Sequence, residues 1–233
     1  MRDRAKLGAT AMIAVAGVVA FGTSACGGGG DPSPTETISV TTGVSPATET
    51  TPATTSEEPG AIVLRLSDLP PGWMELDAGR GFGDDEVCGF QIADGLVETA
   101  ETNFQDAAGT EGVGSEAGVA ATSGDAENLF GVVESTLSAC TEWETPGEPG
   151  TTTWRVEPAD VEPLGDESIA VRLQTGTGAG GFRAVAVYVR VKEYISGVAD
   201  TRSAPDAGTL DEQIAETERL ARIVVDRMGE PAG

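Results

Sequence analysis

Apolar residues recur at helical spacing near the carboxyl end of the chain. Between residues 210 and 228 they repeat every three or four positions, at Leu210, Ile214, Ala221, Val224 and Met228, which places them on one face of a helix. Thr209 and Glu212 match the S/T-x-x-E capping box at its start. The pattern therefore predicts a helix over 210–228.

A second helical pattern lies in the stretch GDAENLFGVVESTLSACTEW. Its apolar stripe consists of Leu129, Phe130, Val133, Leu137 and Cys140. Asp125 precedes the stripe and is a residue type favoured at helix N-caps. We therefore expect a second helix, with Cys140 on its buried side.

Period-two alternation marks the strands, most clearly in FRAVAVYVRVKEYISGVAD. There the valines at 185, 187, 189 and 191 alternate with Ala184, Ala186, Tyr188 and Arg190, so one face is purely apolar and the other is mixed. ESIAVRLQTG and TTTWRVEP have the same character, and shorter strands are expected near 62–66, 102–108 and 116–122. Many strands with two helices predict an α+β fold, an antiparallel β-sheet whose two main flanking helices lie on one face.

The first 25 residues have the pattern of a lipoprotein signal peptide. Arg2, Arg4 and Lys6 precede an apolar run from Leu7 to Gly22. Small residues then lead to Cys26, as in the bacterial lipobox, whose cysteine is diacylated. The alternative is an ordinary secretory signal with an incidental cysteine. Two acyl chains at Cys26 would hold the protein on the outer face of the cytoplasmic membrane.

Residues 26–60 are expected to be a disordered linker. They contain Gly, Pro, Ser and Thr with almost no large apolar side chain, so they cannot form a core. The Thr/Pro-rich part is either a bare linker or a carrier of O-linked sugars. The folded domain is therefore expected to span 61–229.

Charge and composition exclude several classes of function. The net charge is −24, from 38 acidic and 14 basic residues, and this charge repels nucleic acid. The chain contains no histidine, so it lacks the commonest general base and zinc ligand. We therefore expect no nucleic-acid partner, no metal, no cofactor and no catalytic residues.

Cys88 and Cys140 are expected to form a disulfide, because an exported domain meets an oxidising compartment. Two buried free thiols or a metal pair are the alternatives.

The other candidate residues are interpreted as structural or surface residues. Trp73, which follows the LPPG turn, is expected to pack in the core instead of lining a cleft. The acidic groups Asp84–Glu86 and Glu142, Glu144 and Glu148 are expected to be solvated surface, and GTGAGG at 176–181 a hairpin.

A set of segments within 61–229 stands out in order: LSDLPPGWMELD, SACTEW, PLGDESIAVRL, VYVRVKEYISGV and the last helix. Together they resemble the extracellular sensor domain of actinobacterial PknH-type receptor kinases and the lipoproteins that share it. The resemblance implies an antiparallel sheet with flanking helices, a cleft for an unidentified ligand and no catalysis. Lys192-Glu193 stands where the family's hairpin usually has Gly-Asn, and the family's second disulfide cannot form here.

Three classes of function are consistent with these observations. The first is an anchored, non-catalytic module that senses or binds a small molecule, a lipid or an envelope component. The second is an envelope lipoprotein that docks or scaffolds another protein. The third is a hydrolase that uses a pair of carboxylates. A lined pocket would favour the first, and two carboxylates facing each other across a cleft would favour the third.

Overall fold

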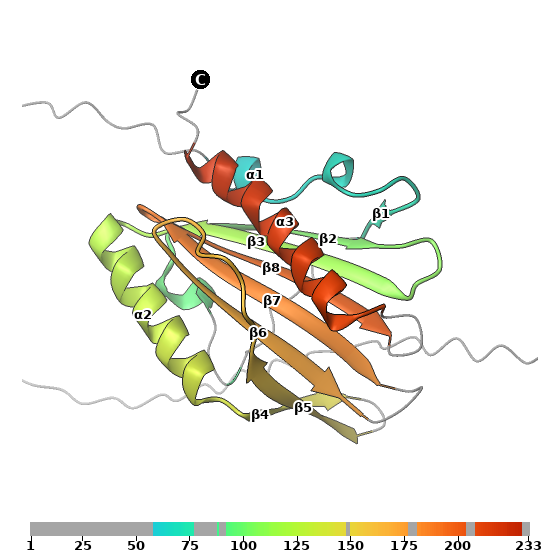
Figure 1. Ribbon diagram of the computed structural model, residues 1–233. Coiled ribbons are helices and arrows are strands. Elements are labelled where there is room, and N and C mark those ends of the chain that lie inside the picture. Colours follow the sequence, from blue (N-terminus) through green and yellow to red (C-terminus); the bar gives the residue numbers. More distant parts are fainter. Residues whose placement is uncertain are drawn as a thin grey trace, which may run out of the picture. The chain divides into compact units, whose positions relative to one another are not determined.

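The computed structural model describes residues 58–76, 88, 92–147, 150–176, 181–203 and 208–229. These residues lie in the unit Ser56–Gly233. The elements are α1 (Pro59–Ile62), η1 (Leu66–Asp68), β1 (Met74–Glu75), η3 (Ile92–Gly95), β2 (Glu98–Gln105), β3 (Glu111–Val119), α2 (Ser123–Ala139), β4 (Glu142–Gly147), β5 (Gly150–Pro158), β6 (Glu167–Thr175), β7 (Phe182–Val191), β8 (Tyr194–Ser203) and α3 (Leu210–Gly229). Figure 1 shows the helices set against one continuous sheet.

The sheet has eight strands in the order β1-β2-β3-β8-β7-β6-β5-β4, and all neighbours are antiparallel. Two meanders, β1–β3 and β4–β8, meet where β3 pairs with β8 from Glu111↔Arg202 to Val119↔Tyr194. The α+β class and the antiparallel sheet predicted from the sequence are confirmed. β3 and β8 are far apart in the chain, so their pairing brings residues from both meanders onto the same faces.

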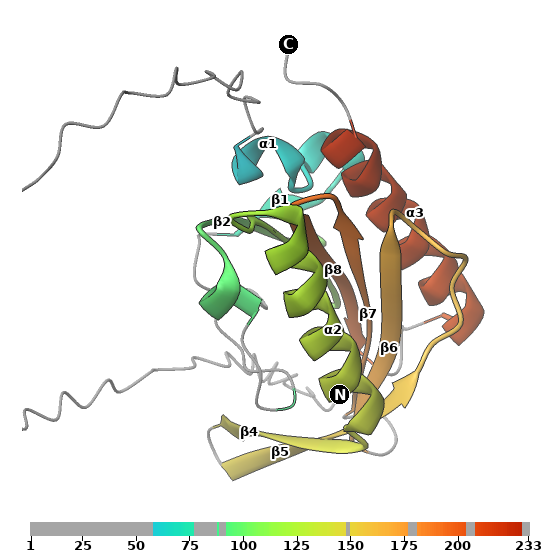
Figure 2. The same ribbon diagram turned by 90° about the vertical axis from the view of Figure 1, so that its left-hand side faces the viewer.

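The two main helices cover opposite faces of this sheet, so the expectation that they share one face is wrong (Figure 2). β7 shows the reason. Val187 and Val189 pack in the cluster that contains α3, whereas Ala184, Ala186 and Tyr188 pack in the cluster that contains α2. The alternation therefore separates two buried faces of different side-chain size. The smaller residues face α2.

α3 begins with the predicted capping box. Thr209 Oγ1 accepts a hydrogen bond from the Glu212 backbone N–H at 3.2 Å, and Glu212 Oε2 accepts one from the Thr209 N–H at 2.9 Å. Ala221, Val224 and Met228 are buried as expected, but Gln213 and Thr217 are buried as well. The polar atoms of these two residues are hydrogen-bonded within the core. Gln213 Nε2 donates to the Asp200 carbonyl, and Thr217 Oγ1 donates to the Gln213 carbonyl.

α2 begins at Ser123, six residues before its apolar stripe starts at Leu129, and its N-cap is Thr122 instead of Asp125. Thr122 Oγ1 accepts from the Asp125 backbone N–H at 3.1 Å and donates to the Asp125 carboxylate at 2.7 Å. Asp125 is therefore the third helical residue, where a carboxylate completes the cap. The stripe of Phe130, Val133 and Leu137 is buried as predicted.

The strand expected at 62–66 is absent, because the chain there forms the end of α1 and an extended connection to η1. Pro59, at the start of α1, and Ile62 are both buried. The ordered fold therefore includes Pro59 and Gly60, which the sequence pattern assigned to the linker. The strands expected at 102–108 and 116–122 are present but displaced, as β2 and β3.

None of the helices in the described ranges is long and apolar enough to cross a membrane.

Candidate functional site

The candidate site lies on the α2-facing side of the sheet, where β2, β3, β8 and β7 run side by side. The register aligns Glu101 with Glu116, Glu116 with Gly197, and Gly197 with Tyr188. The next row on the same face consists of Asn103, Gly114, Ala199 and Ala186. Glycine and alanine therefore form a low floor between two carboxylates and a tyrosine ring.

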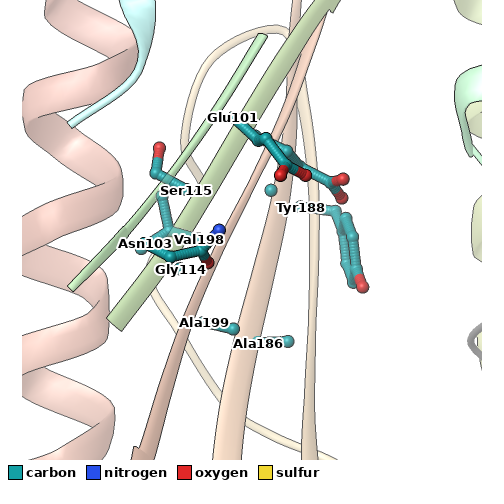
Figure 3. A pocket seen from close by; sticks show the side chains of 10 residues that line it. Glu101, Asn103, Gly114, Ser115, Ala186, Tyr188, Val198 and Ala199 are labelled. Atoms are coloured by element: carbon teal, nitrogen blue, oxygen red, sulfur yellow. The ribbon is translucent and has the colours of Figure 1, made fainter. Parts of the chain in front are cut away.

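A small, partly open pocket is formed over this floor, and Figure 3 shows the side chains that line it. Its volume is about 10 Å³, which is the room that one water molecule needs. A site that encloses a drug-sized ligand is typically about 300–1,000 Å³. This pocket therefore has room for one small functional group and not for a molecule of that size.

Glu116 occupies the centre of the pocket because Gly197 has no side chain. A Cβ added at Gly197 would lie 2.9 Å from Glu116 Oε1 and 3.0 Å from Tyr188 Cε1. The carboxyl group thus rests above the backbone of β8 and beside the tyrosine ring. Burial, together with the negative charge of Glu101, raises the pKa of Glu116 to about 7. Burial also raises the pKa of Tyr188, so its hydroxyl stays protonated.

Glu101 and Glu116 are directly opposite residues on neighbouring antiparallel strands. Such pairs have Cβ atoms roughly 4.5–5.5 Å apart, and like charges there repel. Among the described residues that line the pocket, none is a lysine or an arginine. Burial and the negative charge of Glu101 therefore make the Glu116 carboxyl retain a proton near neutral pH more readily than an isolated glutamate does.

Asn103 supplies the second polar feature. Its side chain is only 6% exposed, and its Nδ2 is buried without a hydrogen-bond partner. A buried donor in this state costs about 1–3 kcal/mol unless something accepts from it. Asn103 lines the same pocket as Glu116. The pocket therefore offers a guest one unused donor beside carboxyl oxygens that accept.

The structure joins Cys88 to Cys140, the pair expected from the sequence, with their Cα atoms 6.1 Å apart. Cys140 is the C-cap of α2 and packs with Trp143 at the edge of the α2-facing core. The disulfide thus fixes the carboxyl end of the helix that covers the candidate face. It does not line the pocket.

The other sequence candidates lie away from the pocket or outside the described residues. Trp73 packs against the core as expected. Glu142 and Glu144 are exposed on β4, whereas Cys26, Asp84–Glu86 and Glu148 fall outside the described residues. Gly176 and Gly181 lie next to the ends of β6 and β7, which are antiparallel neighbours, and residues 177–180 between them fall outside the described residues. The part of the chain that the structure describes contains no cluster of three or more Cys, Asp or Glu side chains suited to a metal ion.

Glu101, Glu116 and Asn103 were missed by reasoning from the sequence. The signal was present as polar residues on the second face of two strands, in ETAETNFQ and EGVGSEAGV. A strictly period-two interpretation places Glu101 and Asn103 on one face of β2. That Glu116 lies opposite Glu101 depends on the register, which the sequence pattern does not show.

The fold is similar to that of a solved structure, described as the crystal structure of the extracellular domain of PknH from Mycobacterium tuberculosis. The TM-score is 0.56 at 11% sequence identity, and the match covers 73% of this chain and 95% of that chain. The shared feature is the fold. No protein-family model matches the chain, and no curated protein sequence matches it.

Proposed function

We propose that the protein is an extracytoplasmic lipoprotein, anchored through Cys26 on the outer face of the cytoplasmic membrane, whose folded domain binds a ligand and does not catalyse. The observation that carries ligand binding is the buried, unpartnered Asn103 amide beside Glu116. A donor in that position is satisfied by a bound group. The likeness of the fold to an extracellular domain supports an extracytoplasmic role.

The anchor rests on the sequence alone. A basic segment, an apolar run and small residues precede Cys26 in the order that lipoprotein processing requires. Metabolic labelling with a fatty-acid probe is expected to mark the wild type and not Cys26→Ser. Equal labelling of Cys26→Ser would refute the anchor and leave the ligand-binding proposal unaffected.

Native mass spectrometry of protein purified from its own membrane tests ligand binding. We expect a non-covalent small molecule to co-purify with the wild type and to be lost from Gly197→Ala, whose methyl group fills the pocket. Gly131→Ala on α2 is the matched control, because nothing lies within 4 Å of its added Cβ. A guest that both variants retain equally would place binding elsewhere.

The structure gives little support to a hydrolase. Glycosidases place two carboxyl groups on either side of the bond to be cleaved, about 5–9.5 Å apart. Glu101 and Glu116 stand side by side on one face of the sheet, and the pocket between them and Tyr188 holds about one water. No room is left there for a sugar ring between the two carboxyls.

Docking of an envelope protein is the alternative function. The large apolar side chains that are exposed in the described residues are Leu66, Met74, Val97, Val132 and Phe182. The pocket, in contrast, gathers a buried donor and a carboxyl acceptor at one place. The pocket therefore favours binding of a small group over docking of a protein.

A further inference from the structure

The chemistry of the pocket restricts the kind of group that fits it. The unpartnered Asn103 Nδ2 needs an acceptor, and the carboxyl oxygens of Glu116, which line the same pocket, can accept a hydrogen bond. The guest must therefore both accept and donate hydrogen bonds within a space about the size of one water molecule.

Few functional groups meet this requirement. An ammonium group only donates, so it would leave the Asn103 amide unsatisfied. A carboxylate or phosphate carries a negative charge, which the charge of Glu101 would repel with no basic residue among the described lining residues to offset it. A hydroxyl group has one donor hydrogen and two acceptor lone pairs, and its size is that of water.

Resting on the ligand binding proposed above, we infer that the pocket binds one hydroxyl group of a neutral, hydroxyl-rich ligand, that is, a polyol or a carbohydrate. The hydroxyl oxygen accepts from Asn103 Nδ2, and its hydrogen is donated to a carboxyl oxygen of Glu116. The rest of the ligand lies outside the pocket. Gly197 admits the hydroxyl because a side chain there would take its place.

Two-dimensional amide NMR of the full chain tests this inference directly. The hydroxyl probes are myo-inositol and methyl α-D-glucopyranoside, the cation probe is methylammonium, and the anion probe is acetate. We expect the hydroxyl probes alone to shift the Asn103 side-chain amide and the Gly197 backbone amide. A contact between the Asn103 amide protons and probe protons can be measured in the wild type, so this test does not depend on whether a variant folds.

Two substitutions distinguish binding of a hydroxyl group from binding of a cation at the pocket. Asn103→Leu removes the donor at similar volume, and we expect it to weaken binding of the hydroxyl probe by up to about tenfold, the value of one hydrogen bond. Glu116→Gln keeps an acceptor, so hydroxyl binding should survive with a smaller loss. Binding of methylammonium that disappears in Glu116→Gln and persists in Asn103→Leu would overturn the hydroxyl inference and leave the proposed ligand binding standing.

A further pair of measurements distinguishes a free sugar from a lipid-borne sugar as the source of the hydroxyl group. Neutral phosphatidylcholine vesicles with and without a glucosyl diacylglycerol present the same sugar on a lipid. Shifts with the free glucoside and with the vesicles both support the inference, and their relative size assigns the sugar to a free or a lipid-borne source. If no probe moves either resonance and only a long-lived water contacts Asn103, both this inference and ligand binding at the pocket are wrong.

Discussion

The raised pKa of Glu116 makes the stability of this domain depend on pH in a way that one substitution can isolate. In the unfolded chain the carboxyl has the ordinary value of 4.5, and in the folded protein its pKa is about 7. Between these values the folded state binds more protons than the unfolded state. The contribution of Glu116 to the free energy of unfolding is therefore largest below pH 4.5, and it falls as the pH rises from 4.5 through 7.

The magnitude follows from the size of the shift. The difference of 7 minus 4.5 is about 2.5 pKa units, and each unit corresponds to 1.36 kcal/mol. The full effect is thus about 3 kcal/mol, an upper bound because the side chain is partly exposed. Glu116→Gln keeps the shape and cannot ionise. We expect the variant to gain up to about 3 kcal/mol over the wild type between pH 4 and pH 8.

The assay is urea unfolding of both proteins at a series of pH values, with the difference in free energy plotted against pH. Other shifted groups, such as Asp200 and Glu216, are present in both proteins and cancel. Glu134→Gln, on the exposed side of α2, is the matched control. Glu101→Gln removes the repelling charge alone and should give an intermediate curve. A difference that stays flat over the whole range would refute the argument.

Three further predictions concern stability. Replacing Cys88 and Cys140 by alanine should lower the free energy of unfolding by about 4 kcal/mol, because the disulfide closes a loop of 52 residues; reduced and oxidised wild type of equal stability would contradict this. Gly131→Ala should stabilise α2 by about 1 kcal/mol, because the methyl group meets nothing within 4 Å, and an unchanged urea midpoint would count against it. Lys192→Gly should stabilise the β7–β8 hairpin by up to about 1 kcal/mol, because Lys192 has φ of 54°; an equal gain from Glu193→Gly would show that this backbone conformation is not the cause.

Features set by residues close in sequence were predictable. Thr209 and Glu212 cap α3 as expected, because a capping box involves only one helical turn. The β7–β8 hairpin follows from alternation on both sides of Lys192-Glu193. Its positive φ at the first turn residue only is that of a type II′ turn, which normally has glycine there. The α3 cap and the position of the hairpin were thus within reach of the sequence, whereas the turn type and the N-cap of α2 were not.

Features that depend on how distant segments of the chain are connected and packed could not be predicted from the sequence. The sequence does not show that α2 connects β3 to a strand at the far edge of the sheet and so covers the face opposite α3. The alanines of β7 are small enough to pack under a helix, and this was the local sign of a second buried face. Buried Gln213 was also missed, since its burial depends on carbonyl partners in β7 and β8.

The pairing of Glu101 with Glu116 depends on the loop that joins β2 to β3. The Asp106 carboxylate accepts hydrogen bonds from the backbone N–H groups of Thr110 at 2.7 Å and Glu111 at 2.9 Å. Burial alone would raise the pKa of Asp106, but these hydrogen bonds outweigh it and lower the pKa. The ionised carboxylate therefore holds the loop in one conformation near neutral pH.

That conformation sets the register, because Gln105 pairs with Gly112 immediately beyond the loop. A slip of β3 by one residue would turn Glu116 toward the α3 face, where the core is apolar. A slip by two would place a glycine opposite Glu101 and separate the carboxyls. The pocket is thus specified by the loop from Asp106 to Glu111, which precedes the lining residues of β3, and by the absence of a side chain at Gly197. Both are backbone features, which is why the acidic pair could not be identified as a site from the spacing of its residues along the chain.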